Sequence, residues 1–241
     1  MSRFLLVHGR HGGAWCWEYL VPALRACGHA AIAIDLPGQG EDSTPAREVT
    51  ARATVDRIVQ ALEPTTILVG HSLGGFWCHR AAGEAPDLVE RMVYLATLVA
   101  RKGESWAETA ERYPGSVIDN TRIDEEQQAV LPPPDYTDAV YNRCPAGDVE
   151  KALARLRPLP LHSLLEAGMA PEPYDPHPSS LAIVCVDDRV QPPSVVEPSA
   201  QAAGVPVIQM AGDHSPFFSE VDALAGVLDE IVRGAAGTGS D

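Results

Sequence analysis

The segment of the chain most informative about chemistry is residues 70–74, G-H-S-L-G, which matches the pattern G-x-S-x-G. In this pattern the serine stands on a sharp turn between a strand and a helix, where only small flanking residues fit and the hydroxyl is exposed. A strand-like run, residues 66–69, leads directly into Gly70, and a helix-compatible segment follows Gly75. The motif in this context predicts Ser72 as a nucleophile.

A serine hydroxyl is a weak nucleophile near neutral pH and needs a base within hydrogen-bonding reach. Of the eight histidines, His214 is the one that follows the last strand-like run and precedes the last helical segment. A loop at the carboxyl end of that strand brings it over Ser72, so we predict His214 as the base. We predict structural roles for His8 and His71, and a packed or surface position for His79.

The histidine in turn needs a carboxylate that holds its tautomer and stabilises the imidazolium. Asp187 and Asp188 follow the strand-like run of residues 181–186, and the order Ser, Asp, His along the chain is the one that accompanies a G-x-S-x-G nucleophile. Only one of the two can point at His214, and we predict Asp188, while Asp187 caps the turn or faces solvent. Asp213 is predicted to be a turn residue, because the side chains of adjacent residues diverge.

Ester hydrolysis also needs two donors aimed at the negative charge that develops on the carbonyl oxygen. The backbone N–H of Leu73, directly after the nucleophile, is predicted to be one of them. The backbone N–H of Arg10, in the glycine-rich loop of residues 8–13, is predicted to be the other. This loop has neither the G-x-G-x-x-G pattern nor the Lys-Ser/Thr ending of phosphate-binding loops, which disfavours a nucleotide site.

Strand-like runs alternate with helical segments, which is typical of an α/β protein with a parallel sheet and crossover helices. The predicted strands are residues 4–7, 30–34, 66–69, 92–95, 181–186 and 205–210. The predicted helices are residues 17–26, 50–62, about 75–84, 195–203 and about 217–232. Each predicted catalytic residue therefore follows the carboxyl end of a strand.

The alternation fails in residues 99–177, which are rich in proline and charge. We predict that this segment, here called the cap, is a helical insertion above the sheet. Residues 1–98 and 178–234 are then the core, and residues 235–241 are predicted to be a disordered tail. Several aromatic and leucine side chains of the cap indicate an apolar ligand, and packing of the cap is their alternative role. They are Trp106, Tyr113, Tyr141, Leu156, Leu159, Leu161 and Leu164.

The composition bears on partners and cofactors. A net charge of −15 argues against nucleic acid or an anionic membrane as partner, since both are bound through clustered Lys and Arg. No apolar run approaches the roughly 18 residues that a membrane span needs. The five cysteines are scattered without C-x-x-C spacing, so we expect no disulfide framework and no metal site. A small-molecule substrate is the expected partner, and a homodimer is one alternative for the oligomeric state.

The N-terminal residues enter an apolar strand-like run at once and lack the features of a signal peptide, so we expect a cytoplasmic protein. Only two lysines accompany sixteen arginines, with abundant Ala, Pro and Gly. This bias is typical of GC-rich bacterial genomes, and we therefore expect a bacterial source.

Residues 4–17, F-L-L-V-H-G-R-H-G-G-A-W-C-W, closely resemble the plant methylesterase and hydroxynitrile lyase branch of the α/β-hydrolases, which bacterial esterases share. The resemblance extends, more weakly in the cap, to residues 28–29, 35–36, 70–75, 141–145 and 212–214. It implies an α/β-hydrolase fold, with a mostly parallel sheet, helices on both faces and an inserted helical cap. It also implies a cofactor-free enzyme with a pocket between sheet and cap for small to medium apolar esters, and a triad of Ser72, Asp188 and His214.

The predicted function is therefore carboxylic ester hydrolysis through an acyl-enzyme. A lyase or cyclase that uses the same triad as acid and base stays open, as does a non-catalytic small-molecule-binding protein on the same scaffold. In the plant lyases of this branch a Thr or Asn stands at the position of Gly9, and many carry a Lys at the position of Ser215. Because a departing cyanide anion is costly to bury without a cation, these two residues disfavour cyanohydrin cleavage.

Overall fold

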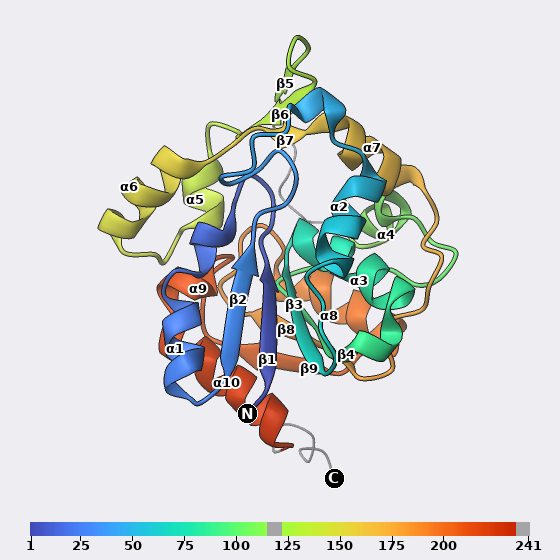
Figure 1. Ribbon diagram of the computed structural model, residues 1–241. Coiled ribbons are helices and arrows are strands. Elements are labelled where there is room, and N and C mark those ends of the chain that lie inside the picture. Colours follow the sequence, from blue (N-terminus) through green and yellow to red (C-terminus); the bar gives the residue numbers. More distant parts are fainter. Residues whose placement is uncertain (115–121, 235–241) are drawn as a thin grey trace.

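The computed structural model describes residues 1–114 and 122–234, and its main feature is a six-stranded sheet of order β2-β1-β3-β4-β8-β9 (Figure 1). Every neighbouring pair of strands in this sheet is parallel. Its strands are β1 (Arg3–Val7), β2 (Ala30–Ile34), β3 (Thr66–His71), β4 (Val89–Leu95), β8 (Ser180–Cys185) and β9 (Val207–Met210). The predicted α/β class is confirmed, while the predicted tail lies outside the described residues.

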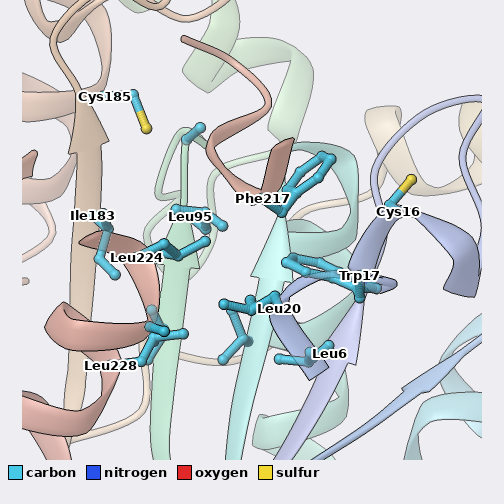
Figure 2. Close-up of a cluster of buried hydrophobic side chains, with 14 of the residues drawn as sticks. Leu6, Cys16, Trp17, Leu20, Leu95, Ile183, Cys185, Phe217, Leu224 and Leu228 are labelled. Atoms are coloured by element: carbon cyan, nitrogen blue, oxygen red, sulfur yellow. The ribbon is translucent and has the colours of Figure 1, made fainter. Parts of the chain in front are cut away.

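The strands are buried on both faces because their side chains alternate between two hydrophobic clusters. On β1, Phe4 and Leu6 belong to one cluster, and Leu5 and Val7 belong to the other. Figure 2 shows part of the first cluster, in which strand residues lie against residues of the covering helices: Leu6, Leu95, Ile183 and Cys185 against Leu20, Phe217, Leu224 and Leu228.

Helices cover both faces of the sheet, as predicted (Figure 1). One face carries α1 (Leu20–Ala26), α9 (Pro216–Ser219) and α10 (Val221–Arg233), and the other carries α2 (Ala51–Val59), α3 (Leu73–Glu84) and α8 (Pro193–Ala202). Three short 3-10 turns, among the described residues, are η1 (Ala14–Trp17), η2 (Ala46–Glu48) and η3 (Pro86–Leu88).

All of the predicted helices differ in their limits from the observed ones, and in two cases another element replaces part of the predicted helix. The helix expected from residue 17 begins at Leu20, because Trp17 closes the 3-10 turn η1. The helix expected from residue 217 is divided into α9 and α10 at Glu220, whose backbone leaves the helical region at φ −142° and ψ 48°. At this break the Glu220 carboxylate pairs with Arg143 of the cap.

The cap lies between β4 and β8. Its elements are α4 (Trp106–Arg112), β5 (Arg122–Asp124), β6 (Ala129–Leu131), α5 (Tyr136–Val140), α6 (Ala146–Arg155), β7 (Leu159–Pro160) and α7 (Leu161–Met169). The sequence predicts only helices here, but the structure adds an antiparallel sheet of order β5-β6-β7. With at most three residues each, these strands are too short for a period of two to be recognised.

No helix within the described ranges, 1–114 and 122–234, has the length and apolarity that crossing a membrane requires.

Candidate active site

Ser72 stands at the turn that its motif predicts, directly after β3 and directly before α3. Its backbone lies at φ 50° and ψ −127°, a region that residues other than glycine rarely adopt. Such local strain is typical of functional positions, where the surrounding fold holds it in place. Ser72 is 6% exposed, so it is buried and not in open solvent.

The glycines of the motif are required by close backbone contacts. A Cβ added to Gly70 would lie 2.5 Å from Gly75 Cα, where strand and helix meet. A Cβ added to Gly74 would lie 2.3 Å from the backbone oxygen of His8, at the end of β1. Any larger side chain would push α3 away from the sheet and move the serine with it.

His214 and Asp188, predicted as base and acid, are in direct contact. His214 Nδ1 donates a hydrogen bond of 2.8 Å to Asp188 Oδ2, and both side chains are buried. The other carboxylate oxygen accepts from the backbone N–H groups of Val190 at 2.7 Å and Gln191 at 2.8 Å, which fix its orientation. With its proton on Nδ1, neutral His214 has a lone pair on Nε2 and can act as a base there.

His71 joins the segment of the nucleophile to the segment of the base. It immediately precedes Ser72, and its Nε2–H donates a hydrogen bond of 2.7 Å to the backbone oxygen of His214. The two imidazole rings lie 4.7 Å apart, centroid to centroid. Burial, and then the neighbouring His214, lower the pKa of His71 well below its ordinary value, so it stays neutral. The sequence predicts a structural role for His71 but not this bond.

The loop after β1 lies against the elbow. A Cβ added to Gly9 would come within 2.9 Å of Ser72 Cβ and of His71 Nδ1, so no side chain fits at this position. His8 Nδ1–H donates to the backbone oxygen of Gly9 at 2.8 Å, and its Nε2 accepts from Leu36 N–H at 3.2 Å. These contacts hold the loop in place. The roles of the Arg10 and Leu73 N–H groups as oxyanion donors stay a prediction.

Asp213 is more than the turn residue that the sequence predicts. It is fully buried, and its carboxylate accepts hydrogen bonds from Ser215 N at 3.0 Å, Ser219 Oγ at 2.8 Å and Arg143 N at 2.8 Å. Cys144 Sγ lies 3.4 Å from the same carboxylate, and burial raises the pKa of this thiol. Asp213 therefore fastens a cap segment to the loop of the candidate base.

Asp187, next to the candidate acid, points to the cap instead of to His214. Its carboxylate pairs with the guanidinium of Arg143, which also bonds to Glu220 at 3.1 Å. We call Arg143, Cys144, Asp187, Asp213 and Glu220 the cap-docking cluster. The segments 141–145 and 212–214 carry the family resemblance, but a pairing across 70 residues leaves no periodic signal in the sequence.

Two further contacts hold the cap near the site. His11 Nδ1–H donates to the backbone oxygen of Arg157 at 2.9 Å, and Tyr136 Oη donates to the backbone oxygen of Arg10 at 3.0 Å. On α3, Arg80 bonds to the fully buried carboxylate of Glu172 through Nη2 at 2.9 Å.

The cap residues predicted to contact an apolar ligand take part in packing. Tyr141 belongs to one hydrophobic cluster, and Leu159, Trp106, Leu161 and Leu164 belong to or pack against the other. Packing thus accounts for these five side chains in the described structure. A ligand-binding role for them stays a prediction.

Comparison with known proteins identifies the family to which the fold belongs. Residues 4–227 match the family model described as "Alpha/beta hydrolase family". The chain is 27% identical to the putative methylesterase 14, chloroplastic, of Arabidopsis thaliana, over 97% of this chain and 72% of that protein. The aligned part spans from 56% to 95% of the lengths of such relatives.

Solved structures share the fold. The methylesterase MES16 of Arabidopsis has a TM-score of 0.81 at 24% identity, with 97% of this chain and all of that one covered. Tomato methylketone synthase I, in complex with 2-tridecanone, has a TM-score of 0.84 at 22% identity, with 97% of this chain and 98% of that one covered. The resemblance to the methylesterase branch is confirmed, and the chain belongs to the alpha/beta hydrolase family.

Proposed function

We propose that the protein hydrolyses carboxylic esters through an acyl-enzyme on Ser72. The observation that carries this proposal is the buried 2.8 Å hydrogen bond between His214 and Asp188, which leaves the lone pair of His214 on Nε2. The backbone of His214 is also bonded to His71, the residue before Ser72 and its strained turn. The esterases among the related proteins support the reaction class.

In the proposed reaction, His214 Nε2 takes the proton of the Ser72 hydroxyl as its oxygen attacks the ester carbonyl carbon. The tetrahedral oxyanion accepts hydrogen bonds from the N–H groups of Leu73 and Arg10. The alcohol leaves with the proton from His214, and Asp188 stabilises the imidazolium in between. Water then gives a proton to His214 and attacks the acyl group, which releases the acid and restores Ser72.

Helix α3 supplies a further electrostatic contribution. It runs from Leu73 to Glu84, so its N-terminus begins at the residue after the nucleophile. The unpaired amides of the first helical turn and the helix dipole favour negative charge there. The charge that develops on the substrate oxygen in the transition state is therefore stabilised more than the neutral ester is, which is what accelerates the reaction.

Cyanohydrin cleavage is the activity that this proposal excludes. Ser215 is fully buried and carries no charge that could hold a departing cyanide. Gly9 leaves no space for the hydroxyl- or amide-bearing side chain that contacts the substrate in the lyases of the resemblance. Lyase or cyclase chemistry on another metabolite remains the second candidate.

The test uses 4-nitrophenyl and phenyl esters of one apolar acid, such as hexanoic acid, with methanol added as a competing nucleophile. If both esters form the same acyl-enzyme, the ratio of methyl ester to free acid is identical for the two leaving groups. We expect this constant ratio, together with no cyanide release from mandelonitrile above the uncatalysed rate.

Three outcomes contradict the proposal. Cyanide release without ester turnover would replace hydrolysis by lyase chemistry. A Ser72→Ala variant that still converts the natural substrate through His214 would show that no acyl-enzyme is needed. A ratio that depends on the leaving group would likewise exclude a common acyl-enzyme.

The partner and the compartment belong to the same proposal. We propose a small molecule as the partner, because a net charge of −15 argues against nucleic acid and anionic membranes. We also propose the cytoplasm as the place of action. Light scattering distinguishes a monomer from a homodimer.

A further inference from the structure

Arg10 lies where the cap meets the candidate nucleophile. It follows Gly9, whose Cβ position faces Ser72 at 2.9 Å. Its backbone oxygen accepts the 3.0 Å hydrogen bond from Tyr136 on α5. Its guanidinium carbon lies 5.9 Å from the centroid of the Trp106 ring on α4. The side chain thus extends from the loop beside the elbow to the aromatic residues of the cap.

This guanidinium has no counter-ion in the described part of the chain. Three other arginines that join core and cap pair with carboxylates: Arg80 with Glu172, Arg143 with Asp187 and Glu220, and Arg155 with Glu18. Arg157 and Arg189 bond to backbone oxygens across the same boundary. Among the described residues, the Arg10 guanidinium contacts the Trp106 ring, interacts electrostatically with Tyr136 and forms no ion pair. Burial lowers the pKa of Arg10 to about 10, so it remains charged near neutral pH. Arg10 is only partly exposed, and a partly buried cation without a counter-ion is costly, so a ligand that brings an anion removes this cost.

A second unmatched donor lies beside it. The indole N–H of Trp106 is buried and has no hydrogen-bond acceptor among the residues that the structure describes. The same ring packs against Phe76, at 6.5 Å between centroids and in an edge-on arrangement. Phe76 stands in the first turn of α3, which begins directly after Ser72. A cation and a neutral donor, neither with an acceptor among the described residues, therefore lie side by side where the loop after β1 meets the cap.

We propose that Arg10 binds a carboxylate of the substrate, so that the preferred substrate is an ester with an apolar body and one free carboxylate. This inference rests on the proposed ester hydrolysis and names its substrate class. The planar guanidinium offers two parallel N–H groups that match the two oxygens of a carboxylate, which a neutral ester cannot use. The carboxylate takes no part in bond breaking, and Arg10 acts through its side chain in specificity.

The test compares two esters that are matched in chain length and leaving group, 4-nitrophenyl hexanoate and the mono-4-nitrophenyl ester of adipic acid. We expect the wild type to prefer the anionic ester in kcat/KM. In Arg10→Met, the ratio of kcat/KM for the anionic ester to kcat/KM for the neutral ester should fall roughly 30-fold, mainly through KM, as loss of a charged hydrogen bond does. Arg10→Lys should restore part of the preference.

Arg47→Met is the matched control, because it removes the same charge from a side chain that is 65% exposed. It should leave the ratio of the two esters as in the wild type. Thermal melts of each variant establish that the ratio is measured on folded protein.

Binding of monomethyl adipate to a Ser72→Ala variant, measured by calorimetry with and without Arg10→Met, gives a readout without turnover. Two results would overturn the role of Arg10 and leave ester hydrolysis standing. One is equal binding of monomethyl adipate by the two proteins, and the other is hydrolysis of both esters with a ratio of kcat/KM values that Arg10→Met does not change. Arg10-dependent binding without turnover of either ester would instead overturn the proposed hydrolysis and leave the carboxylate site.

Discussion

The edge of the sheet and the cap position their residues in different ways. At the sheet edge, Ser72, Asp188 and His214 each stand in a short loop after the end of β3, β8 or β9, so the backbone of a parallel sheet sets their places. The cap is held by side-chain pairs, such as Arg143 with Asp187. The places of these three residues are therefore set by the fold, whereas the attachment of the cap depends on individual side chains that can change without altering the sheet.

The largest effect should come from the nucleophile at the sheet edge. Ser72→Ala should lower kcat for a 4-nitrophenyl ester by about 10⁶-fold, as loss of a triad nucleophile does in serine proteases. Steady-state kinetics with a protein free of wild-type contamination measures it. If kcat fell less than tenfold, the sheet edge would not be the place where the ester is attacked.

The two neighbouring aspartates allow the sheet edge and the cap to be compared directly. Asp188 contacts His214 at the sheet edge, whereas Asp187 contacts Arg143 of the cap. Asp188→Asn should lower kcat by about 10⁴-fold, since an amide at this position favours the wrong tautomer of His214. Asp187→Asn, the matched control, should change kcat little, because it weakens only a half-exposed pair with Arg143. The reverse order of the two effects would contradict the assignment of the acid.

The contact between the loop after β1 and the cap should depend on pH. Burial, and to a lesser degree the charge of Arg10, lower the pKa of His11 from 6.5 to about 4. Between these two values the unfolded chain binds the proton and the folded chain does not, so the free energy of unfolding falls as the pH falls from 6.5 to 4.

His11→Asn removes this dependence and keeps a residue type that tolerates the φ of 60° at this position. Urea titrations measure how far the free energy of unfolding falls between pH 7.5 and pH 4. This fall should be roughly 3 kcal/mol smaller in the variant than in the wild type. His162→Asn, at a side chain that is 54% exposed, is the control. Parallel pH profiles for the wild type and His11→Asn would show that the contact does not exclude water.

The smallest effect should come from the cap-docking cluster. Asp213→Asn replaces a buried acceptor of several hydrogen bonds by a group that also donates, which leaves at least one donor unmatched. The free energy of unfolding should fall by about 2 kcal/mol in urea titrations. Asp87→Asn, on an exposed residue, should cost less than about 0.5 kcal/mol. Equal effects would mean that Asp213 does not fasten the cap.

The same contrast explains what the sequence could predict. The core strands, the turn at Ser72 and the contact between His214 and Asp188 follow from alternation, a local motif and chain order, which are short-range signals. The sequence does not predict two contacts: the hydrogen bond from Arg143 N–H to the Asp213 carboxylate, and the hydrogen bond from His71 to the backbone oxygen of His214. Such contacts between residues far apart in the chain have no period, and the three short strands of the cap have too few residues to show one.

Covalent labelling tests the central claim most directly, because it reads the nucleophile without assuming a substrate. The wild-type protein and a His214→Ala variant are treated with a fluorophosphonate probe, digested and mapped by mass spectrometry. We predict that the wild type carries one adduct on Ser72 and that labelling is strongly slowed in His214→Ala. An adduct on another serine, or equal labelling of both proteins, would contradict the account.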